Sequence, residues 1–270
     1  MPILIAVLLG IVEGLTEYLP VSSTGHLVLA GHWLGLSDDD PARKSFEIVI
    51  QLGAVLAVVV HYRALLAARL RGLASKDPLS LRLLVALAIA FAPAAIVGLK
   101  YGHAIKDLLL KPKPVAAALV VGGIVMIVVE RVRARRAAPV LDGLEHVTPG
   151  RALAIGLGQC FSLFPGASRS MCTIVAGQLS GLSTATAAEF SFLLALPTLG
   201  AATLYEGLKA RHALAAGVGG ASLAAGLVVS FLVAWGVIAS FLKYLRTRGL
   251  EPFGWYRVVI GAVVLWALAS

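Results

Sequence analysis

Residues 13–27 read EGLTEYLPVSSTGHL, a polar stretch with a central proline that separates the apolar runs 3–12 and 27–36. A second polar stretch, GQCFSLFPGASRS at 158–170, also lies between apolar runs. Breaks of this kind occur at membrane depth only where protein covers the backbone or a wet cavity borders it. We therefore expect regions 2–35 and 151–183 each to form a helical hairpin that enters the membrane and returns.

The composition also indicates a membrane protein. Of 270 residues, 59% are hydrophobic and 14% are charged, and the mean hydropathy is +0.91. Soluble domains carry roughly 45–50% apolar and about 25% charged residues, so a soluble globule of this size would not bury so much apolar surface. The net charge of +9 comes from Lys and Arg clusters between apolar runs, a pattern typical of cytoplasmic loops and not of nucleic-acid binding.

Six further apolar segments are long enough to cross a bilayer, which takes about 20 helical residues with some tolerance at the ends. They lie near 46–62, 80–99, 114–130, 188–206, 213–242 and 255–269. The expected fold is therefore an all-α integral membrane protein, a single domain over 1–270. It combines six transmembrane helices with two re-entrant helical hairpins.

The two broken regions correspond to each other along the chain. Pro20 and Pro165 are 145 residues apart, as are Ser23 and Ser168. We expect two repeats, about 1–136 and 149–270, each a broken hairpin followed by three spans. Because three is odd, the second copy must have inverted topology. Proteins of that architecture place their binding site near the midplane, where the two interruptions meet.

The basic clusters agree with this topology. Residues 63–76, 131–136 and 243–248 all fall on one side, which the excess of Lys and Arg marks as cytoplasmic. The segment 100–113 is interpreted as a loop on the opposite side. Its four lysines do not follow the rule, and the topology does not explain them.

Two glutamates precede the first break. Glu13 and Glu17 are four residues apart, so on a helix they share a face within about 6 Å of each other. A charge at the bilayer centre costs roughly 2.5–3.5 kcal/mol even on the lenient insertion scale. A shared proton, a cation or a facing arginine would relieve the repulsion. Alternatively, a short first helix leaves both carboxylates among the lipid headgroups.

Hydroxyl side chains follow each break and precede an apolar run. This is the signature of a helix N-terminus, whose exposed N–H groups attract anions. In an inverted repeat the two N-termini point toward each other, and an arginine joins them. The residues concerned are Ser22, Ser23, Thr24 and His26 at the first break, and Ser168, Arg169, Ser170 and Thr173 at the second.

Each of these residues has a structural explanation when taken alone, because serines often cap helices and a single histidine often packs. Together they fit a phosphate, since arginine has a planar fork that matches phosphate oxygens. Glu17, His26 and a serine supply a base, an acid or second base, and a nucleophile or a position for water. The pattern predicts phosphoryl transfer.

The motifs resemble those of a known family. The segments EGLTEYLPVSSTGHL at 13–27, FEIVIQLGAVLAVV at 46–59 and PGASRSMCTI at 165–174 are similar to signatures of the bacterial undecaprenyl-diphosphate phosphatases associated with bacitracin resistance. The resemblance covers essentially the whole chain. It implies an enzyme that removes the terminal phosphate from a polyprenyl diphosphate lipid, undecaprenyl diphosphate, and so recycles the carrier for cell-wall synthesis.

The resemblance also implies a location and a set of roles. The enzyme would be a multi-pass protein of the bacterial cytoplasmic membrane, with an active site open to the extracytoplasmic side and helped by a divalent cation, Mg²⁺. Its metal ligands and a homodimeric assembly are left open. The expected catalytic residues are Glu17, Ser23, His26 and Arg169, the expected phosphate ligands are Ser22, Thr24, Ser168, Ser170 and Thr173, and Glu13 is the supporting carboxylate.

Two rival functions deserve a test. A lipid-carrier flippase or a proton-coupled anion transporter could use the same midplane residues, because inverted repeats with broken helices are common in transporters. Another class of lipid phosphatase also has SGH-like and SR-like segments. That class needs a further histidine soon after its arginine, and SMCTIVAGQL after Arg169 contains none, so we set it aside.

Overall fold

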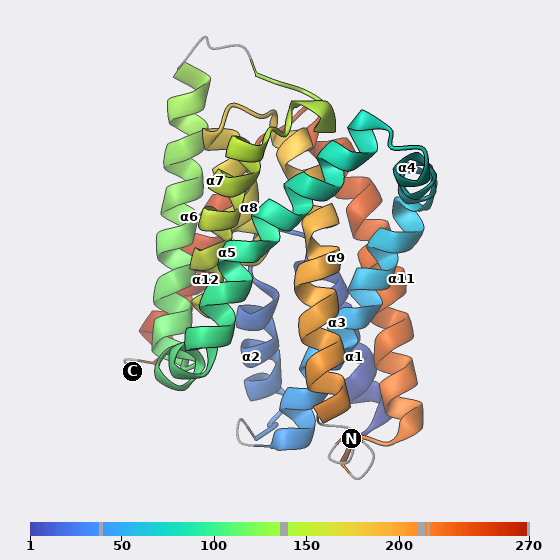
Figure 1. Ribbon diagram of the computed structural model, residues 1–270. Helices are drawn as coiled ribbons and strands as arrows, with labels where there is room; N and C mark the ends of the chain where they lie inside the picture. The colour runs from blue at the N-terminus through green and yellow to red at the C-terminus, as the bar shows by residue number, and fades with distance from the viewer. Residues whose placement is uncertain (38–39, 136–139, 210–213, 215–216, 269–270) are drawn as a thin grey trace. The chain divides into compact units, whose positions relative to one another are not determined.

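The computed structural model describes residues 1–37, 40–135, 140–209, 214 and 217–268, and it is helical throughout (Figure 1). Within these residues no strand forms, and Leu141 and Leu182 make an isolated β-bridge. The α-helices are α1 (Ile3–Thr16), α2 (Ser23–Trp33), α3 (Pro41–His61), α4 (Arg63–Ala74), α5 (Pro78–Leu109), α6 (Pro112–Arg135), α7 (Pro149–Cys160), α8 (Arg169–Leu179), α9 (Thr184–Lys209), α11 (Gly220–Leu245) and α12 (Glu251–Ala267). Short 3-10 turns lie at Leu144–His146 (η1) and Phe161–Leu163 (η2).

Five helices of the described residues are long and apolar enough to cross a membrane. They are Pro41–His61, Pro78–Gly102, Pro112–Arg135, Thr184–Lys209 and Gly220–Leu245. The prediction of an all-α membrane protein is therefore confirmed, and these helices match five of the six predicted spans. At the sixth position α12 has 17 residues, or about 25 Å of helix. Three predicted boundaries lie outside the described residues. They are the end of the first repeat at 136, the start of one span at 213 and the end of another span at 269.

Both predicted interruptions occur in the structure. The first lies between α1, of 14 residues, and α2, of 11 residues. The second lies between α7, of 12 residues, and α8, of 11 residues. At about 1.5 Å per residue none of these helices spans the roughly 30 Å hydrocarbon core. Within each pair the two helices pack against each other.

Two segments differ from the sequence expectation. Residues 63–74, part of the basic segment expected between two spans, form the helix α4, none of whose residues is fully buried. The interpretation of 100–113 as a loop is wrong, because α5 continues without a break to Leu109. No proline lies between Lys100 and Leu109, and the first proline after that segment opens α6 at Pro112.

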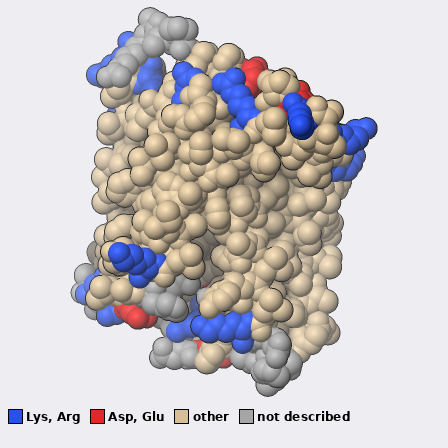
Figure 2. Space-filling view, viewed as in Figure 1, with Lys and Arg blue, Asp and Glu red and all other residues tan. Residues whose placement is uncertain are grey.

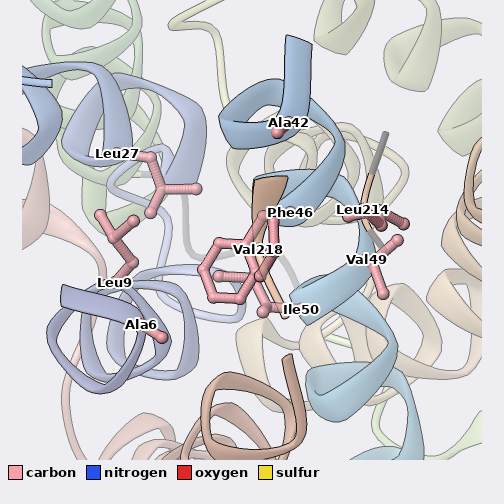
Figure 3. Close-up of a cluster of buried hydrophobic side chains, with 9 residues drawn as sticks. All are labelled: Ala6, Leu9, Leu27, Ala42, Phe46, Val49, Ile50, Leu214 and Val218. Carbon is pink, nitrogen blue, oxygen red and sulfur yellow. The ribbon is translucent and has the colours of Figure 1, made fainter. Parts of the chain in front are cut away.

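The chain forms two compact units, the first comprising residues 1–19, 23–61 and 195–241. In this unit α1 lies close to α11, because a Cβ atom at Gly10 or Gly14 would come within 2.8 Å of an α11 carbonyl oxygen. Small residues four apart permit this close approach of membrane helices. Buried apolar side chains of α1, α2 and α3, including Leu9, Leu27 and Phe46, make the core of the unit (Figure 3). This packing fixes α1, which carries Glu13 and ends immediately before Glu17.

The second unit comprises residues 20–22, 62–194 and 242–270. Here α6 and α12 run side by side (Figure 1). A Cβ atom at Gly123 of α6 would lie 2.6 Å from the carbonyl oxygen of Gly254 in α12, so the two backbones nearly touch. The helix α7 packs between α5 and α8 in the same unit.

Two arginines hold the C-terminal end of α8. Arg133 of α6 donates to the carbonyl oxygens of Gln178 and Leu182, and Arg151 of α7 donates to that of Ser180 at 3.0 Å. Cations stabilise the partial negative charge at a helix C-terminus. Because α8 has 11 residues, its N-terminus lies about 16 Å from this end, or roughly half the thickness of a bilayer core.

The described surface is largely apolar. In the view of Figure 2 most of the surface carries no Lys, Arg, Asp or Glu side chain. Large apolar side chains are exposed along the helices, and Leu99 on α5 is 89% accessible. Surfaces of this kind are stable in contact with lipid and would aggregate in water.

Asp142 supports the start of α9. Its Oδ1 atom accepts hydrogen bonds from the hydroxyls of Ser183, at 2.5 Å, and Thr186, at 3.0 Å. These bonds hold the pKa of Asp142 below its ordinary value of 3.8. A carboxyl whose pKa is lowered by folding stabilises the protein above its unfolded pKa, and the contribution disappears as the pH falls through the folded pKa.

We expect Asp142→Asn to lower the free energy of unfolding at pH 7 by about 0.5–1 kcal/mol, or about 1–4 °C in Tm. The difference from the parent protein should shrink below about pH 4. Thermal unfolding in detergent between pH 3 and pH 7 measures this difference in Tm between the variant and the parent protein. Glu145→Gln, which removes an exposed carboxylate from the same loop, is the matched control and should change Tm less. A difference that persists at the lowest pH would show that the Asp142 charge is not responsible.

Candidate functional site

Glu13, Glu17 and Ser23 form a buried polar group in the first unit. Glu17 continues the helical conformation of α1, and its N–H donates to the carbonyl oxygen of Glu13 at 3.0 Å, so the predicted one-turn spacing is present. Glu13 is fully buried and Glu17 is 6% exposed. The Ser23 hydroxyl donates to Oε2 of Glu17 at 2.6 Å. The sequence analysis predicted a base beside a serine, and the structure brings these two together.

Contacts on both sides hold Glu17 in place. Tyr18, which follows it, is fully buried and donates its hydroxyl to the carbonyl oxygen of Ala54 in α3 at 2.7 Å. Gly14, one turn earlier, leaves no room for a Cβ atom against α11. A carboxylate with such a rigid backbone loses little entropy when it binds a proton or a cation.

Thr24 and His26 lie in the first turn of α2, directly after Ser23. Both side chains are half-buried, whereas Ser23 is 8% exposed. The positive end of the helix dipole lies at this first turn. A neutral imidazole can accept or donate a proton.

Arg169 lies in the second unit with three of the predicted hydroxyl residues. Its Nη1 atom donates to the carbonyl oxygen of Ser191 at 2.9 Å. Ser168 and Ser170 are buried, with their hydroxyl oxygens 3.0 Å apart. The Thr173 hydroxyl donates to the carbonyl oxygen of Arg169 at 2.8 Å and lies 2.6 Å from the Ser191 hydroxyl. Thr173 thus supports the turn that carries Arg169.

Ser22 and Ser168 share an unusual backbone conformation. Ser22 has φ 76° and immediately precedes α2, and Ser168 has φ 74° and immediately precedes α8. Three described non-glycine residues have positive φ, and two of them are these serines. Such conformations cost about 1–3 kcal/mol and concentrate at functional sites. The two helix starts, Ser23 and Arg169, are 146 residues apart. The local geometry therefore pairs Ser168 with Ser22, whereas the offset of 145 residues pairs Ser168 with Ser23.

The Ser168 hydroxyl caps α8. It accepts a hydrogen bond from the N–H of Met171 at 3.3 Å, the contact expected of an N-cap residue. The N-cap predicted from the sequence is therefore present at the second break. The remaining N–H groups of the first turn and the positive end of the helix dipole form an environment that suits an anion.

Two further residues of the second unit were not predicted from the sequence. Ser191 of α9 is fully buried and contacts both Arg169 and Thr173. Arg257 of α12 is fully buried and donates to the carbonyl oxygens of Pro20 at 3.1 Å and Gly166 at 3.0 Å. An arginine within an apolar segment is a functional signal in itself, and Arg257 lay inside the predicted span 255–269.

Oxygen atoms that suit a hard cation are present in the first unit. Mg²⁺ prefers carboxylate oxygens and usually binds through one or two carboxylates together with substrate phosphates. Glu13 and Glu17 supply two carboxylates one turn apart on α1. Among the described residues there is no group of three or more His, Cys, Asp and Glu side chains placed to hold a metal ion. Glu13 and Glu17 therefore supply the donor type that Mg²⁺ prefers.

Comparison with known proteins agrees with this chemistry. Residues 6–263 match the family described as bacitracin resistance protein BacA. An undecaprenyl-diphosphatase of Sorangium cellulosum (strain So ce56) is 62% identical over 262 residues, which cover 97% of this chain and 85% of the relative. The undecaprenyl-diphosphatase of Rhizorhabdus wittichii is 46% identical over 270 residues, 99% of its length. That of Thermoanaerobacter pseudethanolicus is 44% identical over 265 residues. The chain therefore belongs to the BacA family of bacitracin resistance proteins.

Proposed function

We propose that this chain hydrolyses undecaprenyl diphosphate to undecaprenyl phosphate and inorganic phosphate, which returns the lipid carrier to cell-wall synthesis. The structural observation that carries the proposal is the 2.6 Å hydrogen bond from the Ser23 hydroxyl to the buried Glu17 carboxylate. A hydroxyl beside a base is the usual arrangement of an activated nucleophile. Relatives of this chain that match over nearly its whole length are undecaprenyl-diphosphatases.

Glu17 takes the proton of the Ser23 hydroxyl as its oxygen attacks the terminal phosphorus. The bond between that phosphorus and the bridging oxygen breaks, and undecaprenyl phosphate leaves with the bridging oxygen. Water then hydrolyses the phosphoserine, which releases inorganic phosphate and restores the hydroxyl. Ser23→Ala separates this route from direct attack by water, because turnover by that variant would favour water.

Arg169 and the N-termini of α2 and α8 stabilise the charge of the diphosphate. Positioning and electrostatics supply most of the catalysis in phosphoryl transfer. Pro20 and Gly166 each lie three residues before the helix start that carries Ser23 or Arg169, and the guanidinium of Arg257 bonds both carbonyl oxygens.

The remaining predicted residues have supporting roles. Ser22, Thr24, Ser168 and Ser170 bind phosphate oxygens, and His26 transfers a proton or holds the phosphoryl group. Glu13 and Glu17 would hold Mg²⁺ together with the diphosphate oxygens, and the bound cation would neutralise part of the substrate charge. The buried carboxylates favour a cation, because one relieves the repulsion between them.

The topology that we propose has six spans and two re-entrant hairpins in an inverted repeat, with α12 as the sixth span. The short pairs α1 and α2, and α7 and α8, support the hairpins. In the second unit Arg133 and Arg151 hold the C-terminal end of α8, and basic ends are cytoplasmic by the positive-inside rule. The N-terminus of α8 points away from that end, which favours an opening to the extracytoplasmic side.

A phosphate-release assay on the purified protein in detergent tests the proposed function. We expect inorganic phosphate to appear from a polyprenyl diphosphate, activity to fall on addition of a chelator, and Mg²⁺ to restore it. Detergent micelles provide no compartments, so a transporter has no function to perform there and releases no phosphate. Absence of phosphate release by folded protein with Mg²⁺ would contradict the proposal.

A further inference from the structure

Arg257 is a buried cation in the middle of α12. Its side chain is fully buried, on the face that packs against α6, between Gly254 and Gly261. Among its hydrogen bonds in the described residues there is no carboxylate partner. A charge in this position is expensive unless hydrogen bonds replace its hydration. The hydrogen bonds that offset the cost of burying the Arg257 charge therefore indicate the role of this residue.

The compensation comes entirely from backbone oxygens. Nε donates to the carbonyl oxygen of Leu119 at 3.3 Å, and Nη2 donates to that of Ala118 at 3.2 Å, both in α6. Nη1 donates to the carbonyl oxygen of Pro20 at 3.1 Å, and Nη2 also donates to that of Gly166 at 3.0 Å. One planar group thus joins α6 to both interruptions of the apolar segments.

The two contacted carbonyls have equivalent places. Pro20 lies two residues before Ser22, and Gly166 lies two residues before Ser168, the two serines with positive φ. A broken helix leaves carbonyl oxygens without helical donors, and a loop with free carbonyls has several conformations of similar energy. A rigid donor that bonds both loops selects one conformation for each and fixes the distance between them.

We propose that Arg257 is a positioning residue, whose guanidinium sets the conformation and separation of the two loops that present Ser22 and Ser168. The proposal rests on the proposed function for its catalytic consequence. Lysine would not replace Arg257, because a single ammonium group cannot direct donors to four carbonyls spread around a planar fork. Loss of the Arg257 guanidinium would therefore affect the phosphate-binding residues through the backbone of the two loops, and not through a direct contact with them.

Gly122→Ala tests the proposal without removing the buried charge. A Cβ atom at Gly122 would lie 2.3 Å from Nη2 of Arg257, the nitrogen that bonds both Ala118 and Gly166, so the guanidinium must shift. Gly254→Ala is the matched control. It crowds the same pair of helices, with a Cβ atom 2.8 Å from Ile127, and it does not meet the guanidinium.

We expect both variants to lower Tm, and Gly122→Ala alone to lower kcat, by between about 10-fold and 100-fold. The KM of folded, monodisperse protein should stay within about threefold in both. Hydrogen exchange gives a readout independent of turnover. The segments 19–27 and 164–172 should both exchange faster in Gly122→Ala and at the parent rate in Gly254→Ala.

The outcomes separate the two proposals. Equal loss of kcat in both variants, or unchanged exchange of either loop segment in Gly122→Ala, would overturn the positioning role. If the parent protein releases no phosphate, the proposed function fails, and the exchange experiment still decides whether Arg257 holds the two loops.

Discussion

Glu17→Gln is expected to lower the rate of phosphate release by about 10³-fold, equivalent to about 4 kcal/mol of transition-state stabilisation. The glutamine side chain has the same shape and can still accept the 2.6 Å hydrogen bond from Ser23, but it cannot take the proton. The variant should therefore fold normally and lose kcat, and KM should rise because Glu17 would also help to hold the cation shared with the diphosphate. Steady-state phosphate release by the detergent-purified protein measures both constants.

Glu47→Gln is the matched control for this substitution. Glu47 lies on α3 in the same unit as Glu17 and pairs with Arg43 at 2.8 Å, so its neutralisation removes an ion pair of structural value. We expect a lower Tm and a kcat within about twofold of the parent. Turnover by Glu17→Gln at a rate close to that of the parent would exclude Glu17 as the base.

Arg169→Lys is expected to lower kcat/KM by about 10²–10³-fold, or about 3–4 kcal/mol. The substitution keeps the positive charge and removes the planar fork that binds phosphate oxygens in pairs. It also removes the nitrogen that donates to the carbonyl oxygen of Ser191 at 2.9 Å, so the remaining cation is less well placed. The measurement is again phosphate release, with substrate varied across the KM of the parent.

Arg151→Lys provides the comparison in the same unit. Arg151 also donates to backbone oxygens, those of Ser180 and His146, and the change is chemically identical. We expect it to reduce Tm while folded protein keeps its turnover. Near-normal hydrolysis by Arg169→Lys would mean that charge alone suffices at this position, and the role of the fork would have to be abandoned.

Both helix interruptions could be predicted from the sequence because they depend on neighbouring residues alone. A proline followed by serines at the start of an apolar run predicts the end of one helix and the start of the next from adjacent residues alone. The structure places helix starts at Ser23 and Arg169, within the serine-containing stretches that follow the two prolines. The two prolines are 145 residues apart, whereas the two serines with positive φ are 146 residues apart.

Features that depend on tertiary contacts were not predictable in the same way. The bond between Glu17 and Ser23 crosses the break, yet it was expected because both residue types were needed for one reaction. Ser191 and Arg257 are distant in sequence from the residues that they contact, and no local pattern links them. The arginines of α4 mark its segment as a cytoplasmic connection, and this charge pattern does not distinguish a helix from a loop.

The contacts of Arg257 have an evolutionary consequence. All four of its acceptors are main-chain oxygens, which every amino acid supplies, so substitutions at Ala118 or Leu119 leave the acceptor atoms unchanged. A statistical search for covarying positions would therefore find no signal that couples Arg257 to the loops it bonds. In an alignment, the dependence of the loops on Arg257 would appear only as an arginine that is not substituted at this one position. The three-dimensional structure shows the physical reason, which is the set of hydrogen bonds to both loops.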